Sequence, residues 1–282
     1  MQPEMPANRD ARITYTILIL AFYLLGQLGG KFLYPYYSHL LADLPLALRT
    51  TSWSATYFGL VPVIGTVLIF GSKDFWARMG MAKGFWQGLG AAFIMTLPML
   101  IGYAWVADFA INIDWGRDFL FGTIAAPFFE ELFFRAFLFG LLYRYAGWGL
   151  WPVTLLDGLV FGLIHLGQGD SFGAAGAVFA VTAAGAVGFS ILYKEWGWNL
   201  WLVIFLHALM NFYWMAFDVA QNAAGGMWAN VFRMATIAIA FGWTFYRVRQ
   251  QGRQILASAK ESKSGQQNSE EADLQATTSY PV

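Results

Sequence analysis

Long apolar runs separated by short polar connections are the dominant pattern in this 282-residue chain. Eight of them are close to the roughly 20 residues that a helix needs to cross a bilayer. They cover about 13–31, 53–71, 84–106, 118–143, 148–167, 172–193, 198–217 and 227–246. Apolar and polar residues do not alternate within them, which indicates helices rather than the strands of a membrane barrel. The expected fold is an all-α, polytopic membrane bundle of about eight transmembrane helices.

The polar connections suggest how the chain is organised. We expect an N-terminal segment at 1–12, three helices within 13–114, a core of four helices at 115–217, an eighth helix within 218–246 and a polar tail at 247–282. The tail is rich in Gln, Ser, Glu and Lys and cannot bury a core, so we expect it to be disordered. Glycine and alanine dominate 172–193, which predicts a helix used for close packing rather than chemistry.

Composition supports an integral membrane protein. Hydrophobic residues make up 58% of the chain and charged residues only 12%, against about 25% charged in a soluble domain. The lipid bilayer is therefore its first expected partner. A formal net charge of zero argues against nucleic acid as a partner. The absence of cysteine excludes disulfides, thiolate metal sites and a cysteine nucleophile.

Basic residues predict the orientation. With eight helices, twelve Lys and Arg fall on the side of the two termini and three on the opposite side. The twelve are Arg9, Arg12, Lys73, Arg78, Lys83, Arg144, Lys194, Arg247, Arg249, Arg253, Lys260 and Lys263. Because cytoplasmic loops carry the excess of basic residues, we expect both termini in the cytoplasm, in a plasma or inner membrane.

The fourth run contains ionisable residues that need an explanation. Glu130, Glu131 and Arg135 lie within six residues near its middle, where each charge costs roughly 2.5–3.5 kcal/mol on insertion scales. Glu131 and Arg135 are four residues apart and can pair on one helix face. Glu130 is rotated by about 100° from Glu131, given 3.6 residues per turn. It is the carboxylate better placed to accept a proton from water.

Two histidines add to this set. His165 ends the fifth run, and His207 lies in the seventh run, four residues before Asn211. One interpretation is that Glu130, His165 and His207 bind Zn²⁺ and leave a position for water. Another is that Glu130, with His165, activates water without a metal, while His207 and Asn211 donate hydrogen bonds to the oxyanion. A third is a polar lock between helices.

Three motifs resemble those of a known family. Residues 130–135 (EELFFR) resemble its EExxxR motif, 161–165 (FGLIH) its FxxxH motif, and 207–211 (HALMN) its HxxxN motif. The chain is thus similar to the CPBP family of CAAX proteases and bacteriocin-processing enzymes, also called Abi proteins. The resemblance implies that Glu130, Glu131, Arg135, His165, His207 and Asn211 form the catalytic site.

The resemblance also implies an activity. We expect an intramembrane endopeptidase that cleaves a membrane-associated protein or peptide near its terminus, either a prenylated protein or a peptide precursor. It would be glutamate-dependent or a metalloprotease. Two alternatives belong to other classes. One is a non-catalytic scaffold or immunity-type protein that keeps the fold. The other is a transporter, because buried ionisable groups also mark ion paths.

Overall fold

The computed structural model describes residues 8–278, with side chains described for 8–254. The chain divides into two compact units, Met1–Ile239 and Ala240–Val282. Residues 1–7 of the predicted N-terminal segment and 279–282 of the predicted tail lie outside the described part. The π-helical segments are η1 (Ala55–Leu60), η2 (Trp115–Ala125) and η3 (Glu131–Gly140), and η4 (Leu166–Gln168) is a 3₁₀ turn. The α-helices are α1 (Arg9–Leu40), α2 (Leu46–Ser54), α3 (Val61–Phe70), α4 (Phe75–Arg78), α5 (Phe85–Val106), α6 (Ala126–Glu130), α7 (Leu141–Arg144), α8 (Leu150–His165), α9 (Phe172–Glu195), α10 (Leu200–Ala216) and α11 (Met227–Thr278).

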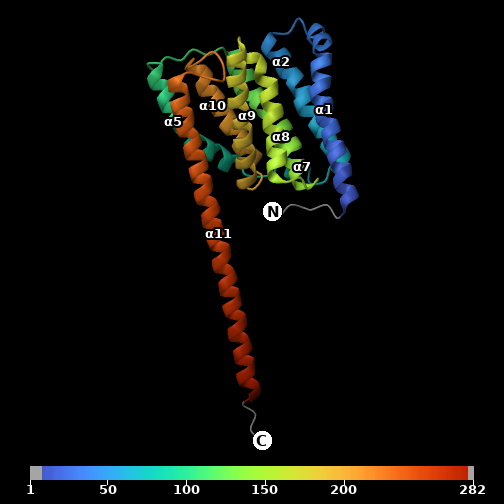
Figure 1. Ribbon diagram of the computed structural model, residues 1–282, viewed down its shortest axis with the longest axis vertical. Helices are drawn as coiled ribbons and strands as arrows, with labels where there is room; N and C mark the ends of the chain where they lie inside the picture. The colour runs from blue at the N-terminus through green and yellow to red at the C-terminus, as the bar shows by residue number, and fades with distance from the viewer. Residues whose placement is uncertain (1–7, 279–282) are drawn as a thin grey trace. The chain divides into compact units, whose positions relative to one another are not determined.

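Throughout residues 8–278 the regular structure is helical, which confirms the predicted all-α class. Figure 1 shows the helices of the first unit standing side by side, with α1 and α2 at one edge and α5 at the other. The closest packing pairs α8 with α9 and α5 with α10. Many large apolar side chains face outward: Ile17, Leu68 and Ile101 are 60%, 70% and 65% exposed. An outer surface of this kind suits lipid and would be a liability in water.

Five stretches are long and apolar enough to cross a membrane, by length and composition. They are Arg9–Leu40, Leu46–Phe70, Phe85–Val106, Leu150–Gln168 and Phe172–Glu195. The predicted span at 198–217 is helical but shorter, as Leu200–Ala216. The predicted span at 118–143 is the run from η2 to α7, which carries the motif charges. Every residue of η3 is buried, so this run forms the centre of the bundle instead of facing lipid.

The central run is held by aromatic packing. Phe133 stacks on Tyr23 of α1 and on Phe58 of η1, with ring centroids 5.0 and 4.8 Å apart. Phe134 meets the ring of Phe161 on α8 edge-on at 5.0 Å. Both phenylalanines of the motif are fully buried. The bundle therefore encloses the EExxxR segment on several sides, and its Glu131 and Arg135 side chains are shielded from lipid.

Glycines set the close approach of α8 to α9. A Cβ on Gly158 would lie 2.8 Å from Val187 Cγ2 and 3.0 Å from the carbonyl oxygen of Ala183. A Cβ on Gly162 would lie 2.8 Å from the Phe179 ring. Only glycine permits this backbone separation at these two positions of α8. Nothing lies within 4 Å of an added Cβ at Gly173, Gly176 and Gly185 of α9, so the close approach depends on the glycines of α8. Close approach also brings polar side chains of α8 and α9 within hydrogen-bonding distance.

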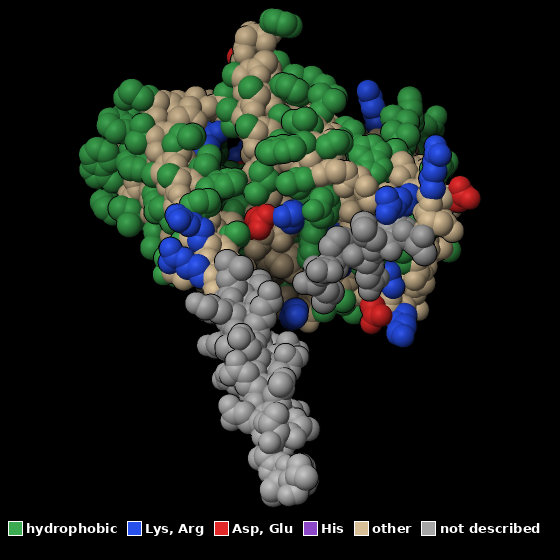
Figure 2. Space-filling view, turned by 60° about the horizontal axis from the view of Figure 1, so that its bottom comes forward, with side chains coloured by type: hydrophobic (Ala, Val, Ile, Leu, Met, Phe, Trp, Pro, Cys, Tyr) green, Lys and Arg blue, Asp and Glu red, His purple; other side chains and the backbone are tan. Residues whose placement is uncertain are grey.

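The basic loop ends of the first unit gather at one end, as the sequence predicts. Arg144 Nη1 donates to the Arg78 carbonyl oxygen at 2.8 Å, and Asn199 Nδ2 donates to that of Gly84 at 3.0 Å. These contacts bring the connections after α3, α7 and α9 together. Figure 2 turns this end forward and shows Lys and Arg side chains on it, below flanks that are largely hydrophobic.

The second unit contains the rest of α11, which continues to Thr278 and so includes most of the predicted tail at 247–282. Gln, Ala and Glu occur six, four and three times in 247–282, and all three favour the helical backbone. The disorder expected from the lack of apolar surface in this tail stays a prediction.

Candidate active site

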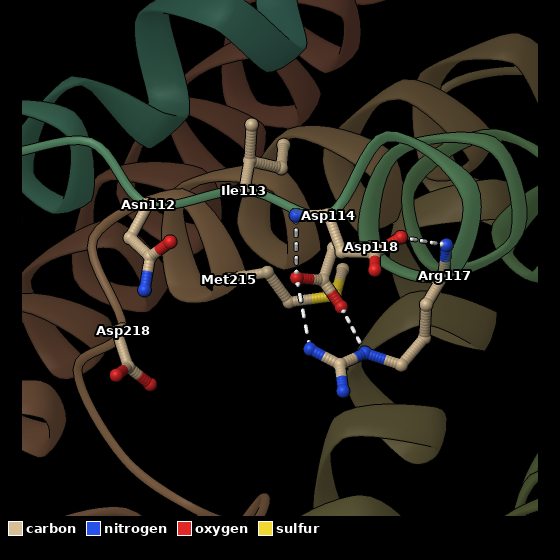
Figure 3. A pocket seen from close by; sticks show the side chains of 7 residues that line it. All are labelled: Asn112, Ile113, Asp114, Arg117, Asp118, Met215 and Asp218. Atoms are coloured by element: carbon tan, nitrogen blue, oxygen red, sulfur yellow. Dashed lines mark hydrogen bonds and ion pairs between the residues drawn. The ribbon is translucent and has the colours of Figure 1, made fainter.

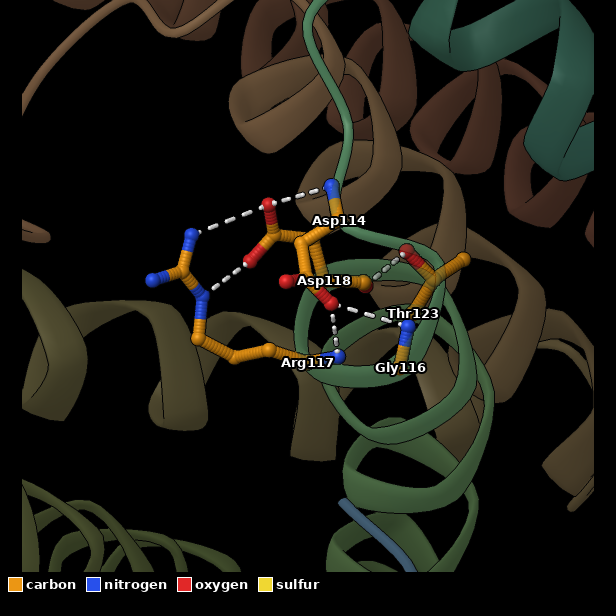
Figure 4. Close-up of polar contacts among 5 residues, drawn as sticks. All are labelled: Asp114, Gly116, Arg117, Asp118 and Thr123. Carbon is orange, nitrogen blue, oxygen red and sulfur yellow. Dashed lines mark hydrogen bonds and ion pairs between the residues drawn. The ribbon is translucent and has the colours of Figure 1, made fainter. Parts of the chain in front are cut away.

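The motif helix begins at a capped corner of the bundle. The Asp114 side chain accepts hydrogen bonds from the backbone N–H groups of Gly116 and Arg117, at 2.9 and 2.7 Å (Figure 4). This satisfies two of the N–H groups that a helix start leaves unpaired. Arg117 donates to Asp118 at 2.7 Å, which raises the pKa of the exposed guanidinium. The corner thus fixes where the central run starts.

A polar pocket of about 320 Å³ lies at this corner. Figure 3 shows the side chains around it. They are Asn112, Ile113, Asp114, Arg117, Asp118, Met215 and Asp218. None of the six predicted site residues is among them, so the pocket belongs to the start of the central run and the end of α10.

The EExxxR motif lies where helix geometry changes. Glu130 is the last residue of α6, and Glu131 is the first of the π-helical η3. Arg135 Nε lies 3.1 Å from Glu131 Oε2, and the two side chains are 1% and 0% exposed. The predicted pairing of Glu131 with Arg135 is confirmed. Because π-helical segments often occur at functional sites, the break between the two glutamates marks this part of the run.

Glu131 also reaches a second motif. His207 Nδ1 of α10 lies 2.8 Å from Glu131 Oε1. A carboxylate can only accept here, so Nδ1 carries the hydrogen and Nε2 points elsewhere. One buried carboxylate therefore joins Arg135 on its own helix to His207 on another. The sequence predicts both groups in one site, but not that Glu131 connects them.

Two residues outside the motifs extend this network. Asp157 Oδ2 of α8 lies 3.8 Å from Arg135 Nε and accepts a 2.6 Å hydrogen bond from Ser190 Oγ of α9. Asp157 and Ser190 are both fully buried. The sequence suggests an interhelical hydrogen bond for Asp157, eight residues before His165, but nothing in the packing helix identifies Ser190 as its partner.

His165 has a similar arrangement on α8. Its Nδ1 lies 2.7 Å from the Phe161 carbonyl oxygen one turn earlier. A carbonyl accepts only, so this nitrogen donates and leaves Nε2 as the free position. The Phe161 ring centroid lies 4.5 Å from that of His165 and 6.5 Å from that of His207. Both histidines thus contact one phenylalanine, and each keeps Nε2 available.

Glu130 and Asn211 complete the predicted set. In the described part of the chain, half-buried Glu130 forms no hydrogen bond or ion pair, so its carboxylate is uncommitted. Asn211 Nδ2 donates to the Gly122 carbonyl oxygen at 3.0 Å and so ties α10 to η2. An amide nitrogen carries two hydrogens, and one remains for another acceptor.

The predicted zinc set does not fit this arrangement. Among the described residues, no three His, Asp or Glu side chains lie close enough together to hold one metal ion. Glu130, His165 and His207 are thus not arranged as a metal centre among the described side chains, and no step below is routed through one.

Arg233, the other intramembrane cation, has a separate role. Its Nη1 donates to the Ala223 carbonyl oxygen at 2.8 Å, and its guanidinium lies 4.4 Å from the centroid of the Trp214 ring. These contacts fasten the loop between α10 and α11. Arg233 therefore belongs to the packing of this loop and not to the motif cluster.

The fold and site define the class. The chain is a polytopic helical membrane protein whose centre joins Glu, Arg and His side chains from different helices. Residues 114–213 match the family model for type II CAAX prenyl endopeptidase Rce1-like proteins. This match supports a CAAX-type intramembrane protease family for the chain and agrees with the resemblance of its three motifs. No curated protein and no solved structure matches it.

Proposed function

We propose that the chain hydrolyses a peptide bond near the terminus of a membrane-associated substrate, with Glu130 activating the attacking water. The observation that carries this proposal is the buried contact between Glu131 and His207. This contact joins the EExxxR motif to the HxxxN motif, and it leaves Nε2 of His207 free. It also commits Glu131 to its partners, which leaves Glu130 as the carboxylate able to take a proton.

The first half of the reaction uses Glu130 and His165. The Glu130 carboxylate accepts a proton from water, and the free Nε2 of His165 accepts a hydrogen bond that orients the same water. The water oxygen then forms a bond to the substrate carbonyl carbon, whose oxygen becomes an oxyanion. A positioned general base of this kind contributes typically 10²–10⁴-fold to a rate.

The second half uses His207 and Asn211. Beside the Glu131 carboxylate, protonated His207 donates from Nε2 to the oxyanion, and Asn211 donates its second amide hydrogen. The C–N bond breaks as the oxyanion collapses, and the proton held by Glu130 passes to the leaving nitrogen.

Asp157 and Ser190 act through Arg135 in this proposal. Asp157 approaches the same Arg135 Nε as Glu131 does, Ser190 donates to Asp157, and Glu131 in turn holds His207. Arg135 also lies 4.4 Å from the Phe161 ring centroid and 5.6 Å from that of Phe189. Asp157 and Ser190 are thus positioning residues. Their loss would disturb the orientation of His207 without removing a group that touches substrate.

Hydrolysis in ¹⁸O-labelled water tests the proposal. Purified protein in lipid discs is incubated with a mixture of peptides carrying hydrophobic termini, and products are read by mass spectrometry. The expected result is one ¹⁸O atom in each new carboxyl terminus, with no products from Glu130→Gln. Glu195→Gln is the control, because the partly exposed Glu195 forms its ion pair with neighbouring Lys194, away from the motif residues. Equal cleavage by Glu130→Gln would overturn the assignment of the base.

A further inference from the structure

A second pocket, of about 280 Å³, lies at the basic end of the first unit, between the loop before α5 and the turn before α10. The residues around it come from these two connections and from α4, α5 and α7. They are Ala77, Gly80, Ala82, Lys83, Gly84, Gln87, Arg144, Trp196, Gly197, Trp198 and Asn199. Two are cations and none is acidic. The lining is therefore suited to an anion.

Arg144 is a buried cation without a counter-ion. It is 6% exposed, and no carboxylate pairs with it in the described part of the chain. Its Nη1 donates to the Arg78 carbonyl oxygen, and its guanidinium lies 5.0 Å from the centroid of the Tyr145 ring and 5.1 Å from that of Trp198. These contacts fix its position but leave its charge uncompensated. Burying an unpaired charge is costly unless an anion joins it.

The pocket is held open by hydrogen bonds between the two connections. Leu200 N donates to the Gly80 carbonyl oxygen at 3.0 Å, and Trp201 Nε1 donates to that of Met81 at 3.1 Å. Asn199 Nδ2 donates to the Gly84 carbonyl oxygen. A pocket whose walls are already joined loses little conformational freedom on binding a ligand.

The surroundings indicate where the ligand comes from. Trp196 and Trp198 line the pocket, and tryptophan is enriched at the level of lipid headgroups. Lys83 and Gln87 are exposed at its rim. Basic pockets between membrane helices on the cytoplasmic side bind acidic lipid headgroups. We infer that this pocket binds the phosphate of an anionic phospholipid headgroup, with Arg144 as its charged base and Lys83 and Gln87 at its mouth.

Lipid retention by the intact chain tests this inference. Protein in mixed detergent micelles is equilibrated with equal amounts of phosphatidylglycerol and phosphatidylcholine of the same acyl chains, and bound lipid is counted by native mass spectrometry. We expect preferential retention of phosphatidylglycerol. Lys83→Gln should weaken it about fivefold, the effect of one surface cation. Lys31→Gln is the matched control, because Lys31 is also exposed and lies in the C-terminal half of α1, outside the pocket.

Three results would contradict it. Equal retention of the two lipids would show that the pocket does not select an anionic headgroup. Equal losses in Lys83→Gln and Lys31→Gln would show general charge attraction instead of a site. Displacement of the lipid by millimolar inorganic phosphate would assign the pocket to a soluble phosphate. Lys83 is exposed and forms no hydrogen bond or ion pair with the described residues, so its variant tests binding and not folding.

Discussion

His207 Nδ1 and Glu131 Oε1 lie 2.8 Å apart, although 76 residues separate them in the chain. This contact joins α10 to the central run inside the bundle. It gives the two adjacent glutamates different tasks: Glu131 holds Arg135 and His207, and Glu130 is left uncommitted. The two residues should therefore respond differently to the same substitution.

Glu131→Gln should destabilise the protein strongly. It removes the charge that faces buried Arg135, whose remaining carboxylate, Asp157, lies 3.8 Å away. Breaking a buried ion pair by removing one partner costs about 3–5 kcal/mol. Thermal unfolding in detergent measures this as a large drop in Tm, while Glu130→Gln should change Tm little. Equal Tm values for the two variants would contradict the division of roles.

His207→Ala should slow turnover by about 10²–10³-fold, the usual loss when one oxyanion donor is removed. The measurement is kcat on a cleaved peptide, corrected for the folded fraction. His39→Ala is the control, because His39 lies in the last turn of α1, away from the three motifs. An unchanged kcat for His207→Ala would remove His207 from the reaction.

Gly158→Leu should disrupt the candidate active site, although Gly158 itself is not part of that site. Its side chain would meet Val187 and the Ala183 backbone at 2.8 and 3.0 Å and push α9 away from α8. Overpacking costs typically 1–3 kcal/mol, and here it also separates Ser190 from Asp157. Gly167→Leu is the matched control for Gly158→Leu, because nothing lies within 4 Å of a Cβ at position 167. If both variants lose activity to the same degree, the packing argument is wrong.

Chelation tests the arrangement of the donor side chains. Because no three His, Asp or Glu groups converge in the described residues, we expect peptide cleavage to persist after dialysis against 1,10-phenanthroline. The readout is initial rate before and after treatment, followed by addition of Zn²⁺. A loss of activity that only zinc restores would contradict this expectation and favour a zinc site formed by Glu130, His165 and His207.

Sequence reasoning predicts much of this site. Charges inside apolar runs are rare enough to identify the motif residues, and i,i+4 spacing predicts the pair of Glu131 and Arg135. Spacing within a helix says nothing about which groups meet between helices. The contacts of Glu131 with His207 and of Ser190 with Asp157 depend on how α8, α9 and α10 pack, so they could not be predicted.

For the fold, too, the sequence predicts some features and not others. Long apolar runs predict helices, and five are long and apolar enough to cross a membrane. The π-helical turns of η2 and η3 could not be predicted, because residues 115–140 also fit an α-helix. The expected disorder of the tail rests on its missing apolar surface and stays a prediction, while α11 continues to Thr278.

Terminus-selective mass spectrometry of membranes tests the central claim most directly. Membranes expressing wild type and Glu130→Gln at matched levels are compared for peptide termini. The account predicts termini that appear only with wild type, close to the ends of membrane-associated proteins or peptides. Identical termini in the two membranes, under conditions where the protein is needed, would contradict it and favour a scaffold that keeps the protease fold.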